Sequence, residues 1–305
     1  MVQSKWNHLM GIVYVNLATM AWASNMVMGR LLKDSIGPVT LAASRFLVAA
    51  VIFAIFLRHQ SQTERRIGKD WRLLAGMAAT GVVLFSPVLY LGLHYTSAVN
   101  GTLINGIGPL LTGAMTAFFL HQPMSRRQIV GAVIGFAGVL YLISGGSASF
   151  WQTAQFNVGD IIVLLSVAFW GLYSVIGSRV MRHRSAVSTT AFSTMMGLPV
   201  LILLSLWELR SFPVMVDAQM ILSVLYLGVV PAAGGFYAWN AGVARLGPSG
   251  AMVFYNTLPL YGALLGITLL GEPIGLPHVI GGLLIIGGSI WAAKQPAARK
   301  TEENV

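Results

Sequence analysis

Long runs of apolar residues restrict what this chain can fold into more than any other feature of its sequence. Ten runs approach the roughly 20 residues that an α-helix needs to cross the hydrocarbon core of a bilayer. They cover approximately residues 9–30, 37–57, 73–93, 97–119, 127–145, 159–178, 188–207, 219–241, 247–269 and 274–293. Because the runs are continuous and do not alternate with polar residues, they predict helices rather than the strands of a barrel. The predicted fold class is an all-α integral membrane protein with ten transmembrane helices.

The scarcity of charge excludes a soluble protein. Charged residues make up only 9 % of the 305 residues and apolar residues 56 %, whereas a soluble domain carries roughly 25 % charged residues. Cysteine is absent, so neither disulfides nor thiolate metal sites are available. No metal cluster, hydrolytic triad or phosphate-binding glycine loop can be recognised. We therefore expect no metal, no cofactor, no enzymatic activity and no ATP-driven pumping.

The formal net charge of +10 has two explanations. In a soluble protein it would suggest a nucleic-acid partner, but in a membrane protein basic residues collect in cytoplasmic loops. With a cytoplasmic N-terminus, fifteen basic residues fall inside, three fall outside, and Arg45 alone lies well within a span. This distribution predicts no nucleic-acid partner, a bacterial inner (plasma) membrane location, and cytoplasmic N- and C-termini. The first apolar run lacks a convincing cleavage site, so we expect it to be retained.

Residues recur at a spacing that suggests an internal duplication. Glycines, prolines and leucines coincide at an offset of 150 at Leu120/Leu270, Pro123/Pro273, Gly131/Gly281 and Gly138/Gly288. Gly11, Trp22 and Gly29 match Gly159, Trp170 and Gly177 at an offset of 148. Five predicted helices per half is an odd number, so the second half must enter the membrane from the opposite face. We predict two inverted five-helix repeats, residues 1–148 and residues 149–305 with a short cytoplasmic C-terminal tail.

With ten predicted helices and "LLGEPIGLPHVIGGLLIIGG" closing the second half, the chain resembles the drug/metabolite transporter superfamily, EamA type. The resemblance spans roughly residues 10 to 293 and is greatest to bacterial exporters of aromatic amino acids. It implies a secondary transporter that works by alternating access. The first half departs from the pattern, since it reads His121-Gln122-Pro123 where the second reads Gly271-Glu272-Pro273. A shared catalytic role for Glu272 is therefore not expected.

Polar and aromatic residues inside the spans are the candidates for substrate contact. An Asn in lipid would leave its amide unpaired, so Asn25 should face either protein or a watery cavity. Aromatic rings at span ends, such as Trp207, fit an interfacial belt, but Trp22 and Trp170 lie too deep for one. The candidate substrate-binding residues are Trp22, Asn25, Arg45, Tyr90, His94, Asn105, Trp170, Tyr173, Tyr237, Asn240, Tyr255 and Asn256.

Two of the candidates, Arg45 and His94, can carry a charge, and each has two interpretations. Arg45 could reach the headgroup region, or it could bind a substrate carboxylate. His94 could be structural or carry a proton. None of the nine acidic residues falls at the centre of a span, which argues against polycationic substrates and weakens the case for simple proton antiport.

The predicted function is export of small neutral or zwitterionic metabolites, with aromatic amino acids favoured by the resemblance. The alternatives are an exporter or permease for sugars, purines or drugs, and a non-transporting intramembrane enzyme or scaffold. The expected partners are a small-molecule substrate and the lipid bilayer. The sequence gives no indication of oligomeric state.

Overall fold

The computed structural model describes residues 2–121, 125–147, 157–212, 214–255 and 257–293. All regular secondary structure in these residues is helical. The first half contains α1 (Val2–Leu31), α2 (Pro38–Arg58), α3 (Trp71–Met77), α4 (Phe85–Tyr95), α5 (Ala98–Asn105), α6 (Gly108–Leu120) and α7 (Arg126–Ile143). The second half contains α9 (Val158–Val180), α10 (Ala186–Glu208), α11 (Ala218–Leu227), α12 (Gly235–Tyr255), α13 (Leu258–Leu270) and α14 (Leu276–Ala293). A short 3-10 turn, η1 (Gly68–Asp70), precedes α3. Two π-helical segments, η2 (Ala78–Leu84) and η3 (Gly228–Gly234), join α3 to α4 and α11 to α12.

Within the described part of the chain, seven helices are long and apolar enough to cross a membrane, and two further apolar helices, α13 and α14, are shorter. The first predicted span, α1, is not among the seven, because polar residues such as Asn16 and Asn25 lower its mean hydropathy. The all-helical membrane architecture agrees with the sequence prediction. The count of ten spans stays a prediction.

One predicted junction differs from the structure. The sequence analysis ended a helix near residue 241 and began the next near 247, but α12 continues through this stretch to Tyr255. Pro248 lies in the continuous stretch, and a proline need not end a membrane helix when neighbouring groups satisfy the carbonyl that it frees. The helical break comes instead just before α13.

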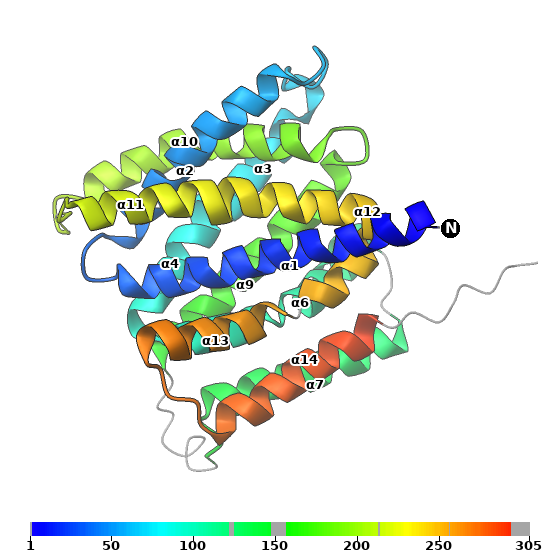
Figure 1. The fold of residues 1–305 in the computed structure, drawn as a ribbon, viewed down its shortest axis with the longest axis vertical. Coiled ribbons are helices and arrows are strands. Elements are labelled where there is room, and N and C mark those ends of the chain that lie inside the picture. Colours follow the sequence, from blue (N-terminus) through cyan, green and yellow to red (C-terminus); the bar gives the residue numbers. More distant parts are fainter. Residues whose placement is uncertain (1, 122–124, 148–156, 213, 256, 294–305) are drawn as a thin grey trace, which may run out of the picture.

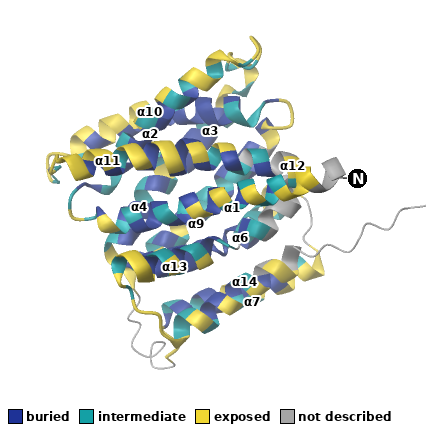
Figure 2. Cartoon of the chain, viewed as in Figure 1, coloured by how far each residue is buried: buried dark blue, intermediate teal, exposed yellow. Residues whose placement is uncertain are grey.

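The helices pack in pairs that join the two halves of the chain (Figure 1). The α7 helix lies along α14 at one edge of the bundle, and α2 lies along α10 at the other. Between these edges, α1 packs against α12 and α13, while α9 packs against α4 and α6. Exposed residues lie mostly in loops and on the outward faces of outer helices such as α10 and α11 (Figure 2). An apolar outer surface of this kind suits contact with lipid.

Two glutamates stabilise the α2–α10 pair from opposite ends. Glu208, at the end of α10, accepts hydrogen bonds from the backbone N–H groups of Val39 and Thr40 at the start of α2. Glu64, which follows α2, accepts them from the backbone and side chain of Ser185 at the start of α10. Partial burial raises the pKa of Glu64, but the Ser185 hydrogen bonds and the charge of Arg184 outweigh it, so the net shift is downward. The carboxylate therefore stays charged at neutral pH, as a helix N-terminus favours.

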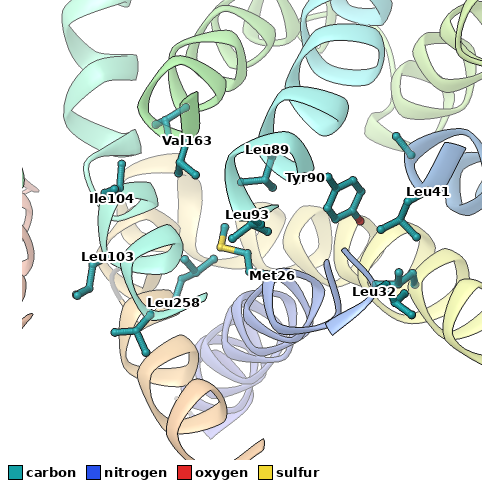
Figure 3. Packing of buried hydrophobic residues seen from close by; sticks show 14 of the residues in the cluster. Met26, Leu32, Leu41, Leu89, Tyr90, Leu93, Leu103, Ile104, Val163 and Leu258 are labelled. Atoms are coloured by element: carbon teal, nitrogen blue, oxygen red, sulfur yellow. The ribbon is translucent and has the colours of Figure 1, made fainter. Parts of the chain in front are cut away.

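A large apolar cluster fills the bundle at the end where α1 finishes. Figure 3 shows Met26 of α1, Leu41 of α2 and Leu93 of α4 within it, and Leu93 is fully buried. Arg30 reinforces this end of the bundle, because it donates hydrogen bonds to the carbonyl oxygens of Leu93 and His94. This end of the bundle is therefore tightly packed.

Candidate functional site

A narrow cavity of about 40 Å³ lies in the middle of the bundle. Helices of both halves line it, from α1 and α2 to α12 and α13. Six of the twelve predicted site residues are in its wall. They are Trp22, Asn25, Arg45, Asn105, Trp170 and Tyr255.

Arg45 is the only charged residue among the described residues of the cavity wall, and it is 5 % exposed. The headgroup interpretation was wrong, because the guanidinium turns into the bundle. It donates one hydrogen bond to Asn25 Oδ1 and one to Ser86 Oγ, each at 2.6 Å. Its carbon Cζ lies 4.6 Å from the ring centre of Phe46. No described ion pair involves Arg45, and its Nε has no hydrogen-bond partner.

Asn25 organises this polar corner of the cavity. Its Oδ1 also accepts a hydrogen bond of 2.6 Å from the Tyr90 hydroxyl. Tyr90 thus holds the network from behind, since it is 1 % exposed and does not line the cavity. Both interpretations of Asn25, cavity and packing, hold at once: the amide lines the cavity and joins α1 to α2 and α4.

Aromatic rings form another part of the cavity wall. Trp22 and Trp170, which match at the offset of 148, meet with ring centres 6.0 Å apart at an angle of 71°. The indole N–H of Trp22 is satisfied by the carbonyl oxygen of Pro231 at 3.1 Å. Trp170 stacks on Tyr173 at 4.9 Å and contacts Phe85 at 5.1 Å. Such a wall suits a flat apolar group.

Asn105 and Tyr255 lie at a third side, and they occupy matching positions at the offset of 150. The Tyr255 hydroxyl donates to Asn105 Oδ1 at 2.9 Å. Asn105 Nδ2 is buried and has no hydrogen-bond partner. This amide is therefore a second unsatisfied group at the cavity.

Other predicted residues lie elsewhere. Tyr173 is buried behind Trp170 and does not line the cavity. Tyr237 was wrongly predicted, because it is 53 % exposed and faces Tyr14 on the outer side of α1. His94 lies one turn beyond Tyr90, with Nδ1 2.9 Å from the Tyr90 carbonyl oxygen and its ring against Phe212. This position agrees with a structural His94. Asn256 and the side chain of Asn240 lie outside the described residues.

The sequence analysis missed eight lining residues. They are Met26, Phe46, Gly81, Phe85, Leu89, Pro231, Phe236 and Leu258. Gly81 and Pro231 match at the offset of 150, and each lies in a π-helical segment, which is a frequent feature of functional sites. Because the two residues differ in type, the repeat did not identify them, and apolar residues such as Leu89 carry no signal either.

None of the described residues that line the cavity is acidic. Asp160 is 2 % exposed and accepts hydrogen bonds from Thr96 Oγ1 and Asn100 Nδ2. Glu272 accepts hydrogen bonds of 2.8 and 2.9 Å from the backbone N–H groups of Ala98 and Val99 at the start of α5. No group of three potential metal ligands occurs in the part of the chain that the structure describes.

We expect Glu272→Gln to weaken the fold modestly and to leave transport intact. The glutamine amide keeps one oxygen that can accept a hydrogen bond from the N-terminus of α5, but the negative charge is lost. We expect the free energy of unfolding to fall by about 1 kcal/mol. A thermal melt of the purified variant and a counterflow assay measure the two effects. Abolished counterflow at a normal protein level would show that Glu272 takes part in transport.

Comparison with known proteins places this arrangement in a family. The model of the EamA-like transporter family matches residues 9–144 and again residues 157–293. A Bacillus subtilis protein named "Uncharacterized transporter YyaM" is 30 % identical over 262 residues, 84 % of this chain and 84 % of that protein. A second B. subtilis protein, "Uncharacterized transporter YetK", is 28 % identical over 95 % of this chain and 90 % of its own length.

Two further matches extend the comparison. A Streptantibioticus cattleyicolor protein named "Probable terminal-alkyne amino-acid exporter" is 26 % identical over 290 residues, 94 % of each chain. A solved crystal structure is similar with a TM-score of 0.61 at 21 % identity, covering 94 % of this chain and 96 % of that one. The second match shows a shared fold.

Proposed function

This chain belongs to the EamA-like transporter family and is a membrane transporter, and from that premise we propose that it exports small neutral or zwitterionic metabolites, with aromatic amino acids as preferred substrates. The observation that carries the proposal is the central cavity, where a buried Arg45 faces rings such as Trp22 and Trp170. An aromatic amino acid has a carboxylate that can bind Arg45 and an apolar side chain that can pack against the rings. The amino-acid exporter among the relatives supports the same substrate class.

We further propose that the transporter consists of two inverted five-helix repeats, residues 1–148 and 149–305. The family model matches once in each half. Several main helix pairs correspond when the halves are exchanged: α1 with α12 corresponds to α9 with α4, and α1 with α13 to α9 with α6. An added Cβ at Gly138 would lie 2.8 Å from the Gly281 carbonyl oxygen, and one at Gly288 would lie 2.6 Å from that of Gly131. The second contact is the first with the two halves exchanged, because Gly288 corresponds to Gly138 and Gly131 to Gly281 at the offset of 150. A two-fold axis that relates the repeats would produce this pair of contacts.

Alternating access follows from this architecture as a proposal. Equivalent helices of the two repeats surround the cavity, and relative movement of the repeats exposes it to each side in turn. The apolar cluster around Met26 and Leu93 fills the side on which α1 ends. With the proposed cytoplasmic N-terminus, this packed side faces the outside.

Counterflow in liposomes tests the function. Purified protein is reconstituted with a high internal concentration of one unlabelled metabolite, and uptake of the labelled metabolite is followed across a panel of aromatic amino acids, sugars and purines. We expect accumulation with aromatic amino acids and none with sugars. Accumulation with sugars or purines alone would replace the proposed substrate class.

Cysteine labelling tests the proposed inner-membrane orientation, and the cysteine-free sequence provides a clean background. We expect Ser147→Cys to react with an impermeant maleimide in intact cells, and Gln62→Cys to react only after permeabilisation, because the basic loop around Gln62 should be cytoplasmic. The reverse pattern would invert the proposed topology.

A further inference from the structure

The cavity contains hydrogen-bond donors that lack partners. Among the described residues, four buried side-chain atoms have no hydrogen-bond partner, and two of them, Arg45 Nε and Asn105 Nδ2, belong to residues that line the cavity. The other two, on His94 and Asn100, belong to residues outside its wall. Since a guanidinium can only donate, the unmet Arg45 Nε–H does not depend on how oxygen and nitrogen atoms are assigned, as it would for an amide.

The charge of Arg45 is also unmatched. Its partners, Asn25 Oδ1 and Ser86 Oγ, are neutral acceptors, and no acidic side chain lines the cavity. A buried cation without a counter-ion is costly, and a bound anion removes much of that cost. A carboxylate suits the planar guanidinium better than other monovalent groups, because it can accept two parallel hydrogen bonds.

The described lining residues offer no site that would bind a cationic group as Arg45 could bind an anionic one. A ligand whose only charge is an ammonium group would find no carboxylate among the described lining residues. The rest of the wall offers rings such as Trp22, Phe85 and Trp170, which suit an apolar group. The cavity therefore discriminates by the charge of one end of its ligand.

The duplication does not supply a second cation. Ser193 occupies the position that matches Arg45 at the offset of 148, and Tyr173 the position that matches Asn25. The site is thus polarised, with one cationic end and one aromatic end. A ligand with a single anionic group fits it in a single orientation.

We propose that the transporter recognises its substrate by a carboxylate at Arg45 and an apolar body on the aromatic wall, and that an amino group is not required. The substrate class then includes amphipathic monocarboxylates as well as amino acids. This inference rests on the proposed function only in taking the cavity as the transport site.

Ligand binding to the detergent-solubilised protein tests the inference without requiring transport. The probes are phenylalanine, 3-phenylpropionate, phenethylamine and phenylalanine amide, and the readout is the shift of the thermal midpoint with ligand concentration. We expect the two carboxylates to bind within about tenfold of each other and the two compounds without a carboxylate to bind at least about 30-fold more weakly. Equal binding of phenethylamine, or no binding of 3-phenylpropionate, would overturn the inference.

The variant Asn25→Asp probes the same site in a folded protein. It places a carboxylate on the atom that Arg45 already contacts at 2.6 Å, so the cation is neutralised from within. We expect binding of 3-phenylpropionate to weaken by about 10- to 100-fold. The matched control is Asn16→Asp, on the same helix and outside the cavity wall, which keeps its acceptor for the Tyr261 hydroxyl and should bind normally.

The outcomes separate the two proposals. If both carboxylates bind and Asn25→Asp abolishes that binding, the inference stands even when no counterflow is seen, and the proposed function is wrong. If Asn25→Asp binds 3-phenylpropionate as tightly as the parent protein, Arg45 is not the anion site and the inference fails, whatever the transport result.

Discussion

Gly288→Leu is expected to prevent the protein from folding to a monodisperse state, whereas Gly287→Leu, one position earlier, is expected to be tolerated. A Cβ at Gly288 would lie 2.6 Å from the Gly131 carbonyl oxygen and 2.8 Å from the Gly135 backbone nitrogen. These are backbone atoms of α7, so no side chain can move aside to make room. Gly287 is exposed, and nothing lies within 4 Å of the position where its Cβ would be.

The size of the effect follows from the packing of α14 on α7. Small residues allow two membrane helices to approach closely, and dispersion contacts between them provide much of the stability. Overpacking costs about 1–3 kcal/mol for an added methyl group and more for a leucine, which must push the helices apart along their length. Gly288→Ala should accordingly give an intermediate loss of stability.

Fluorescence-detected size-exclusion chromatography and thermal melts measure this series. The expected order of stability is parent, then Gly287→Leu close to it, then Gly288→Ala, then Gly288→Leu. Equal behaviour of the two leucine variants would show that α7 and α14 do not meet at Gly288.

The repeated glycines show what the sequence could predict about the fold. Gly131 and Gly138 matched Gly281 and Gly288 in the sequence, which indicated equivalent helices. The spacing did not indicate that these helices contact each other, because periodicity describes one helix at a time. That Gly138 faces Gly281 depends on tertiary packing.

The lining residues that could be predicted from the sequence are those whose type is unusual at their depth in a membrane span. Asn25, Arg45 and Trp170 stood out because each is unusual deep in a membrane span, and all three line the cavity. Tyr237 was wrong for the converse reason: an aromatic ring is equally at home against lipid, and nothing in the sequence separates the two environments. Apolar lining residues such as Phe236 are as common in a core as in a cavity, so they could not be identified.

Trp170→Ala is expected to weaken substrate binding by roughly five- to a hundredfold. The ring of Trp170 lies in the cavity wall between Trp22 and Phe85, with centre distances of 6.0 and 5.1 Å. Burying an apolar ring of the substrate against it contributes about 1–3 kcal/mol, which corresponds to that range of affinity. The midpoint shift with phenylalanine, measured as a function of concentration, reports the change.

Two controls separate binding from packing. Trp239 contacts Trp22 and Tyr255 at 5.5 and 5.6 Å but does not line the cavity, so Trp239→Ala should reduce stability without a comparable loss of affinity. Trp207 is 70 % exposed and was assigned to the interfacial belt, so Trp207→Ala should change neither. Truncating a fully buried tryptophan costs about 3–5 kcal/mol of stability. Trp170 and Trp239 are both partly buried, so both alanine variants should melt at lower temperature than the parent. If Trp239→Ala weakens binding as much as Trp170→Ala does, the aromatic residues act through packing alone and the cavity wall is not the binding surface.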